Sequence, residues 1–132
     1  MFSSIKTSKV NRDLVTKLTN KLNLGAENVI ARIAFAYSLS QKKTMDLTQI
    51  QDSSGKEYNV KVLFGDYAEI YIALICVHYN IYKSDKDIAR YIKMHIDDGL
   101  QGIYDEIETK NSISGNDFII NQVELGLAHL GV

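Results

Sequence analysis

The fold of this chain is decided between residues 3 and 40, which read SSIKTSKVNRDLVTKLTNKLNLGAENVIARIAFAYSLS. Residues 4–10 predict a brief strand, and Asn11 is a suitable N-cap for a helix that follows it. This helix is expected to run to about Leu24 and to stop at the glycine after it. A second helix is expected over about residues 26–41. The order short strand, helix, glycine, helix therefore predicts the start of a helical domain.

The first of these helices is amphipathic and the second is not. Four apolar residues recur at three- and four-residue spacing and define the buried stripe of the first helix: Leu14, Val15, Leu18 and Leu22. Lys17 and Lys21 lie outside this stripe and one turn apart, so their side chains point the same way. The second helix is apolar on nearly every side, which predicts that it is buried on more than one face.

The middle of the chain changes pattern twice. Residues 44–62 predict a loop or an irregular hairpin, with its turn at residues 54–55. A helix is then expected over about residues 65–79. Because this stretch is the most hydrophobic of the chain, it is expected to be the central helix of the core.

A further helix is expected after Ser84, which forms a variant of the capping box with Asp87. Gly99 is expected to interrupt this helix, and a shorter helical stretch follows over residues 100–108.

The C-terminal part completes a mainly helical domain. After a turn-prone segment, residues 111–115, a final helix is expected over residues 117–130, packed against the rest. The sequence thus predicts one compact, mainly α domain over residues 1–132. Its short N-terminal strand resembles the start of a ribbon-helix-helix protein, and an irregular hairpin or loop lies near residues 44–63.

The charges are unevenly distributed along the chain. Its formal net charge is −1, yet the residues up to 43 include eight Lys or Arg and two acids, a difference of +6. Residues 44–132 include seven Lys or Arg and fourteen acids. The N-terminal basic residues are Lys6, Lys9, Arg12, Lys17, Lys21, Arg32, Lys42 and Lys43. A basic face of this kind suits phosphates, whereas the acidic remainder is expected to face partner subunits or solvent.

Five cations of the N-terminal third are the candidate nucleic-acid contacts. In order of preference they are Lys17 and Lys21, then Lys6, Lys9 and Arg12. For each of them the alternative is an ordinary solvated charge. Arg32 lies on the apolar second helix and is interpreted as half of a structural ion pair.

The sequence carries few patterns of catalysis or metal binding. His95 and Asp98 would share one helix face, but they supply two ligands where a catalytic zinc needs about three, so His95 is interpreted as structural. Phosphate-binding glycine loops and nucleophile motifs are absent from the sequence. The lone Cys76 is interpreted as a buried thiol, and it cannot hold an iron–sulfur cluster. We therefore predict no catalytic residue, no metal and no cofactor.

The chain also lacks the patterns of membrane insertion. It has no N-terminal signal sequence, and its longest apolar run is too short and too interrupted to cross a bilayer. These features predict a cytoplasmic protein that has no membrane partner.

Four short blocks of sequence carry a resemblance to a known family. They are residues 28–34 (NVIARIA), 55–57 (GKE), 63–65 (LFG) and 95–100 (HIDDGL). In their order and spacing they resemble the DndE family of bacterial DNA phosphorothioation systems, and the resemblance extends from Ile5 to Leu130.

This resemblance implies a specific setting. Such systems, which are associated with restriction-modification, replace a non-bridging phosphate oxygen of DNA with sulfur. They use a cysteine desulfurase, an iron–sulfur protein and an ATPase-like partner. The resemblance to DndE implies that this chain is the accessory subunit of such a system. It also implies a helical homotetramer that has no cofactor and binds double-stranded DNA, notably nicked duplex, through surface lysines.

Three functions are compatible with the sequence. The leading hypothesis is a non-enzymatic DNA-binding subunit of a DNA sulfur-modification complex, which works as an oligomer with other subunits of that complex. The first alternative is a sequence-specific repressor of the ribbon-helix-helix kind, which would be a dimer with strands in the major groove. The second is a structural assembly subunit whose lysines only keep it soluble.

Overall fold

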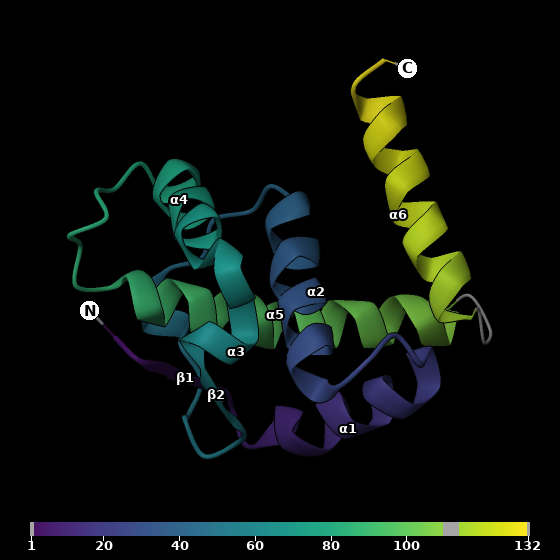
Figure 1. Cartoon of the computed structure of the whole chain (residues 1–132), viewed down its shortest axis with the longest axis horizontal. Helices are drawn as coiled ribbons and strands as arrows, with labels where there is room; N and C mark the ends of the chain where they lie inside the picture. The colour runs from purple at the N-terminus through teal and green to yellow at the C-terminus, as the bar shows by residue number, and fades with distance from the viewer. Residues whose placement is uncertain (1, 110–113, 132) are drawn as a thin grey trace.

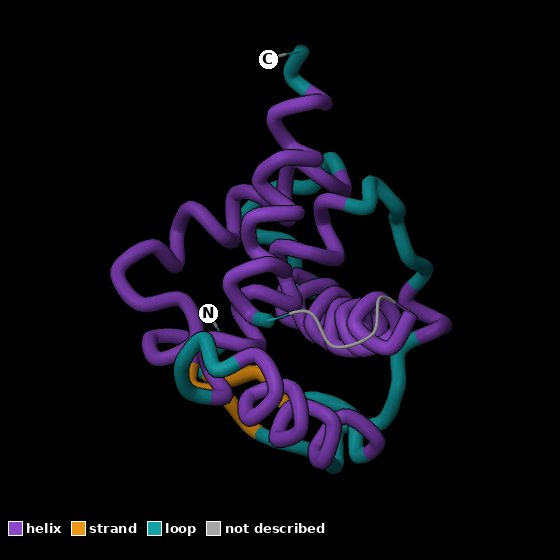
Figure 2. The backbone as a smooth tube through the Cα atoms, turned by 90° about the vertical axis from the view of Figure 1, so that its right-hand side faces the viewer, coloured by secondary structure: helices purple, strands orange, loops and turns teal. Residues whose placement is uncertain are grey.

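The computed structural model describes residues 2–109 and 114–131. It consists mainly of helices with one two-stranded sheet, which confirms the predicted fold class (Figure 1, Figure 2). In chain order the elements are β1 Ser4–Lys6, α1 Val10–Leu22, α2 Glu27–Ser40, the 3-10 turn η1 Leu47–Gln49, β2 Glu57–Asn59, α3 Val60–Phe64, the 3-10 turn η2 Gly65–Tyr67, α4 Ala68–Tyr79, α5 Ile88–Thr109 and α6 Gly115–His129.

The central element of the fold is α5, a helix of 22 residues that crosses the middle of the molecule (Figure 1). It packs against α1, α2, α4 and β1. Apolar residues every three or four positions give it one continuous buried face: Ile88, Ile92, Ile96, Leu100, Ile103 and Ile107. Full burial of each such side chain stabilises the fold by roughly 1.5–3 kcal/mol. The prediction that residues 65–79 form the central core helix is therefore wrong.

The hydrophobic helix α4 lies at the edge of the fold instead. Only Ile72 and Ile75 are buried on it, while Ile70 is 59% and Val77 is 82% exposed. Because α4 is apolar on all sides, its sequence pattern cannot show which side meets the core. A strip of apolar side chains is left on the surface of this monomer.

A close crossing of α2 and α5 explains Gly99. A Cβ atom added to Gly99 would lie 1.9 Å from the carbonyl oxygen of Ala34 on α2. The glycine therefore permits the two backbones to approach, and α5 continues through it without a break. The predicted interruption at Gly99 is wrong, since here a missing side chain serves helix packing rather than helix termination.

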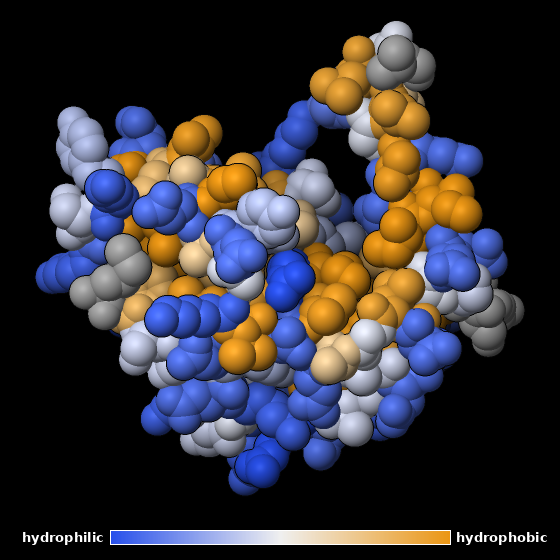
Figure 3. Space-filling view, viewed as in Figure 1, coloured by the Kyte–Doolittle hydropathy of each residue, from blue (hydrophilic) through white to orange (hydrophobic). Residues whose placement is uncertain are grey.

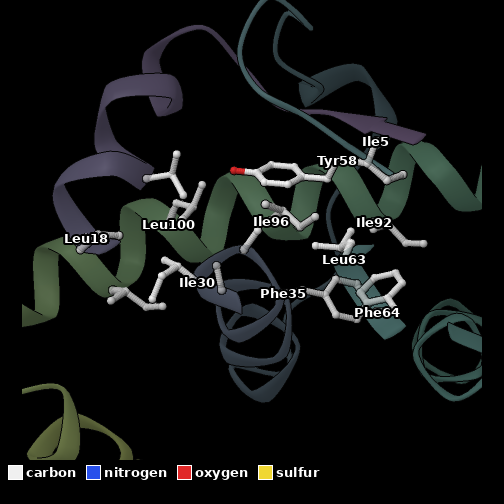
Figure 4. Packing of buried hydrophobic residues seen from close by; sticks show 14 of the residues in the cluster. Ile5, Leu18, Ile30, Phe35, Tyr58, Leu63, Phe64, Ile92, Ile96 and Leu100 are labelled. Carbon is white, nitrogen blue, oxygen red and sulfur yellow. The ribbon is translucent and has the colours of Figure 1, made fainter. Parts of the chain in front are cut away.

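The N-terminal strand is paired within the chain. β1 and β2 form an antiparallel pair in which Ile5 lies opposite Tyr58, and both side chains are buried against α5 (Figure 4). The loop at residues 44–56 therefore ends in a strand whose partner is the N-terminus, and the local hairpin considered for residues 44–62 does not form. The cause is the long-range pairing of Ile5 and Tyr58, which puts two apolar side chains into the core.

The helix boundaries agree with the predictions to within a few residues, but the capping residues differ. Lys9 occupies the N-cap of α1, whereas Asn11 is buried inside its first turn. Asn23, in the left-handed conformation at φ 52°, ends α1 before Gly25 is reached. Before α5, the carboxylate of Asp85 accepts a hydrogen bond from the backbone N–H of Asp87, so Ser84 is not the acceptor there.

The last helix is confirmed in position but not in packing. α6 projects away from the body of the molecule (Figure 1). Phe118 at its start is buried, but Val123, Leu127 and Leu130 are 46–79% exposed, so the prediction that residues 117–130 pack against the rest holds only for the start of the helix. Most of the turn predicted at residues 111–115 lies outside the described residues.

The close crossing of α2 and α5 gives a direct stability test. We expect Gly99→Ala to lower the free energy of unfolding by about 3 kcal/mol, because the new methyl group meets the rigid backbone of Ala34. Chemical denaturation followed by circular dichroism measures this change. Gly126→Ala is the matched control, since its Cβ would meet no atom within 4 Å and should change stability by about 1 kcal/mol or less. Equal effects of the two substitutions would contradict this account of the crossing.

Candidate nucleic-acid interface

The basic N-terminal segment is fastened to α5 by the buried carboxylate of Asp97. Its Oδ1 accepts hydrogen bonds from the backbone N–H of Ser8 at 3.0 Å and from Nδ2 of Asn11 at 2.7 Å. Its Oδ2 accepts a bond from Nζ of Lys93 at 2.7 Å. Asp97 is 2% exposed and Lys93 is 5% exposed. A buried charge is tolerated only when it is paired and hydrogen-bonded, so this cluster is a strong constraint on the positions of Ser8 and Asn11.

The loop before β2 is tied to the same cluster. Nζ of Lys93 also donates to the backbone carbonyl of Asp52 at 2.6 Å. The carboxylate of Asp52 accepts bonds from the backbone N–H groups of Lys9 at 2.8 Å and Ser54 at 3.0 Å. These bonds, that from Lys9 first, hold the pKa of Asp52 below its usual range. The segment around Lys9 is thus a fixed turn and not a loose arm.

Gly55 completes this attachment. Its backbone N–H donates to the carbonyl of Thr7 at 2.9 Å, and a Cβ on Gly55 would lie 2.1 Å from the carbonyl oxygen of Ser8. Only glycine permits so close an approach of the two chain segments.

All five predicted contact residues lie on the surface, and they follow one another along β1 and α1. Lys6 is on β1, Lys9 is the N-cap of α1, and Arg12, Lys17 and Lys21 are on α1 itself. The buried stripe of α1 faces the core, as predicted, so its polar side is turned outward. The lower edge of the molecule, where α1 lies, is accordingly hydrophilic (Figure 3).

The two preferred lysines differ in their surroundings. Nζ of Lys21 forms an ion pair with Oε1 of Glu108 on α5 at 3.0 Å. Lys17 is exposed and forms no ion pair with another residue of the described part of the chain. Of the two, Lys17 is therefore the more available for an external phosphate.

The basic N-terminal third and the acidic remainder of the sequence are only partly separated in the folded molecule. Glu108 pairs with Lys21, Asp98 pairs with Lys43 at 2.6 Å, and Glu27 pairs with Lys56 at 3.3 Å. The first two pairs bring acids that are distant in sequence to N-terminal lysines and compensate part of their charge, whereas the third pairs the N-terminal acid Glu27 with a lysine from the later part of the chain.

Arg32 has a structural role, but not in the predicted form. Its Nε donates to the carbonyl of Leu63 at 2.6 Å and its Nη2 donates to the carbonyl of Val62 at 3.2 Å. The guanidinium group therefore satisfies carbonyls at the end of α3, and among the described residues it forms no ion pair. The sequence could not show this, because the acceptors belong to the backbone.

His95 belongs to a second buried network. Its Nδ1 lies 2.8 Å from Oγ of Ser38, which donates to Oδ2 of Asp98 at 2.7 Å. Its Nε2 lies 2.6 Å from the hydroxyl of Tyr79, which accepts a bond from the backbone N–H of Met45 at 3.1 Å. These bonds are consistent with a neutral imidazole that carries its proton on Nδ1, donates to Ser38 and accepts from Tyr79.

The burial of this network explains its electrostatics. His95 and Ser38 are fully buried, and burial, aided by the nearby His78, lowers the pKa of His95 to about 4. The imidazole is neutral at physiological pH and links α2, α4 and α5. No group of three or more His, Cys, Asp or Glu side chains suited to a metal occurs among residues 2–109 and 114–131.

The comparisons with known proteins agree with this architecture. The model of the family "DNA sulphur modification protein DndE" matches residues 4–111. The chain belongs to the DndE family. This family takes part in DNA phosphorothioation, so DNA and the other proteins of that modification system are its context. No curated protein sequence matches the chain.

Two solved structures share the fold of this DndE-family chain. The crystal structure of DndE from Escherichia coli B7A involved in DNA phosphorothioation modification aligns with a TM-score of 0.63 and 16% identity. The alignment covers 78% of this chain and 98% of that one. The structure of a DndE mutant involved in DNA phosphorothioation gives 0.65 at 17% identity, over 77% of this chain and 97% of that one. The family match ends before α6.

Sequence reasoning missed the buried cluster around Asp97. The available signal was the spacing of Lys93 and Asp97, two opposite charges one helical turn apart. Two of the resemblance blocks acquire a physical meaning here: residues 55–57 contain the glycine beneath Ser8, and residues 95–100 contain Asp97 and Gly99.

The neutral state of His95 predicts how stability depends on pH. Its pKa is depressed in the folded state, so its contribution is complete above about pH 6.5, the value in the unfolded chain. As the pH falls toward about 4, this contribution is lost, and it amounts to roughly 3 kcal/mol. Urea unfolding at pH 7 and pH 5 should show a smaller difference for His95→Gln than for the wild type. An identical pH dependence in both would contradict the buried neutral state.

Proposed function

We propose that this chain is a non-catalytic DNA-binding subunit of a DNA phosphorothioation complex, which works in the cytoplasm on duplex DNA, either intact or nicked. Its cations Lys17, Lys9 and Arg12, then Lys6 and Lys21, contact backbone phosphates. The observation that carries the proposal is the basic turn formed by residues 8–12, which is held in one position in a DndE-family chain because the buried carboxylate of Asp97 accepts hydrogen bonds from Ser8 and Asn11.

Rigidity matters because binding orders the groups that make the contacts. A lysine on a floating arm loses backbone and side-chain freedom when it meets a phosphate, whereas a lysine on a fixed helix loses only side-chain freedom. Phosphate contacts of this kind position a protein on DNA without reading its sequence. The expected signature is therefore strong salt dependence and little sequence preference.

The ion pair between Lys21 and Glu108 affects how this surface works. Both side chains are partly exposed, at 36% and 52%, so the pair contributes less than about 1 kcal/mol. A phosphate can therefore take the place of the carboxylate at little cost. Lys21 should contribute less to affinity than Lys17.

The absence of catalysis is part of the proposal. The triad-like set of Ser38, His95 and Asp98 has its serine and histidine fully buried. Because Ser38 and His95 are fully buried, neither is exposed to a substrate phosphate, and their hydrogen bonds are already made within the network. This network supports a structural role.

We further propose that the working form is a homo-oligomer, a tetramer as the family resemblance implies, which joins other subunits of the complex. Apolar side chains are exposed along α4 and α6, and Figure 3 shows them on the same face of the molecule. A hollow of about 720 Å³ between α2 and α6 is lined largely by apolar residues, among them Ile33, Phe118 and Leu125. Clusters of exposed apolar side chains are typical of protein interfaces.

The assembly is measured by analytical ultracentrifugation. We expect a particle of about four times the 14.9 kDa mass of one chain. Replacing Ile70 and Leu74 of α4 by Asp should reduce that mass, because carboxylates are costly to bury in an apolar contact. A wild-type protein that sediments as a monomer at micromolar concentration would rule out the oligomer.

The repressor alternative receives less support from the fold. A ribbon-helix-helix protein reads DNA with paired strands in the major groove. Here β1 is three residues long and already pairs with β2 of the same chain, with its central residue Ile5 buried. The assembly-only alternative predicts a tight partner complex without DNA affinity.

DNA titration tests the proposal directly. We expect the wild type to bind intact, nicked and unrelated-sequence duplexes with similar dependence on salt concentration. Lys17→Glu combined with Lys21→Glu should lower the affinity at least 10-fold, because two attractive contacts become repulsive. Fluorescence anisotropy at several salt concentrations measures both effects.

A matched control separates local contact from net charge. Lys61→Glu combined with Lys83→Glu changes the total charge equally, at exposed lysines on α3 and in the loop before α5. This control should retain most of the affinity. Equal losses of affinity in both double variants would mean that only the net charge of the protein matters, which would contradict a local contact. A strong preference for one DNA sequence would favour a repressor.

A further inference from the structure

We propose that Arg90 and Lys6 together bind one phosphodiester group of the DNA backbone, in a hollow between β1 and the first turns of α5. This inference rests on the proposed DNA-binding function and adds to it a contact residue from the acidic part of the sequence. The two residues are 84 positions apart in the chain, and the fold places them on one hollow.

The lining of this hollow suits an anion. Its volume is about 410 Å³, and it is lined by three cationic residues, two uncharged polar residues with donor groups, a serine of β1 and three apolar residues. The cations are Lys6, Arg90 and Lys93, and the polar pair is Gln51 and Ser53. None of the described residues that line it is acidic. A site with donors and positive charge but no carboxylate in its wall favours phosphate.

Two of the nearest acids are engaged elsewhere. Asp52, beside the wall, directs its carboxylate to the backbone N–H groups of Lys9 and Ser54. Asp97 is committed to the buried cluster, and Glu57 accepts a hydrogen bond from Oγ of Ser4 at 2.8 Å. Asp52 and Asp97 therefore offer little competition to an incoming phosphate, whereas Glu57, the cross-strand partner of Lys6, keeps its charge and competes for that lysine.

Arg90 is available for the contact. Its side chain is 52% exposed, and its ion pair with Asp87, whose side chain is 21% exposed, is long at 3.3 Å and only partly shielded from water, so it is weak. That pair uses one nitrogen of the guanidinium group, which has five N–H donors in a planar fork. A phosphodiester can be bound by the remaining donors while Asp87 keeps its place.

The third cation has a supporting role. Lys93 is 5% exposed, and its Nζ donates two of its three hydrogens to the carboxylate of Asp97 and the carbonyl of Asp52. These two bonds fix the loop at Asp52 beside the hollow. Because Lys93 is buried and already bonded, the direct contacts with the phosphate are made by Lys6 and Arg90.

The location of the hollow connects it to the interface already described. Lys6 is three residues before Lys9, and three residues span at most about 10 Å of extended chain. Phosphates follow one another every 3.4 Å along the axis of a DNA strand. A strand bound along Lys9 and Arg12 can therefore present its next phosphates to Lys6 and Arg90.

A double-mutant cycle tests the proposal. The variants are Lys6→Glu, Arg90→Glu and their combination, with Lys61→Glu as a control of equal charge change, all titrated against the same duplex at several salt concentrations. We expect each single reversal to lower affinity about 10-fold and to reduce the salt slope by about one. Because both side chains hold the same phosphate, the combined loss should be clearly smaller than the product of the single losses. Arg90→Lys should retain most of the affinity.

The design keeps folding and function separate. Arg90 is the third residue of α5, where a glutamate interacts favourably with the helix dipole, so Arg90→Glu should fold, as circular dichroism will verify. If the wild type binds DNA but Arg90→Glu binds like the Lys61→Glu control, the hollow is not a phosphate site, while the proposed function stands. If the single losses multiply, the two residues do not share a phosphate. If the wild type binds no DNA, the proposed function fails and this inference with it.

Discussion

The buried carboxylate of Asp97 is the interaction on which the functional part of this molecule depends. With its partner Lys93 it joins three segments that are far apart in sequence: the N-terminal turn at Ser8 and Asn11, helix α5, and the loop at Asp52, whose carbonyl accepts from Lys93. Such a cluster contributes little net stability over an apolar alternative, but removing one partner leaves an unpaired buried charge at a cost of about 3–5 kcal/mol. The cluster therefore specifies where the basic segment lies. The cations of β1 and α1 gain a defined geometry from a residue that is itself buried.

Much of the helical framework was predictable because helix periodicity is a local property. The stripe of α1 and the extent of α2 follow from residue spacing alone. The errors have a common cause, which is that packing partners are not encoded locally. Gly99 resembled a helix break because its role depends on Ala34, which lies on another helix. The hydrophobicity of α4 suggested a core position, yet burial in this monomer is decided by α5, whose pattern is less hydrophobic but continuous over 22 residues.

The candidate site was predictable as a set of charges but not as a surface. The basic segment is visible in the sequence, and all five of its preferred cations are exposed. The sequence could not show that Glu108 neutralises part of Lys21, or that Arg90 lies near Lys6, since both relations arise from the tertiary fold. The count of charges along the sequence also overstated how far the basic N-terminal third is separated in space from the acidic remainder. Ion pairs between α1 and α5 and between the loop after α2 and α5 reduce it.

The buried ion pair of Asp97 and Lys93 holds the basic turn rigidly. Amide hydrogen exchange of the wild-type chain tests this rigidity most directly. The backbone N–H of Ser8 donates to Asp97, and that of Gly55 donates to Thr7. The account predicts that both amides exchange only when the whole domain unfolds, with protection equal to that of the amides in the centre of α5. Rapid exchange of Ser8 and Gly55, at rates close to those of exposed loop amides, would show that the segment opens on its own and would contradict the account.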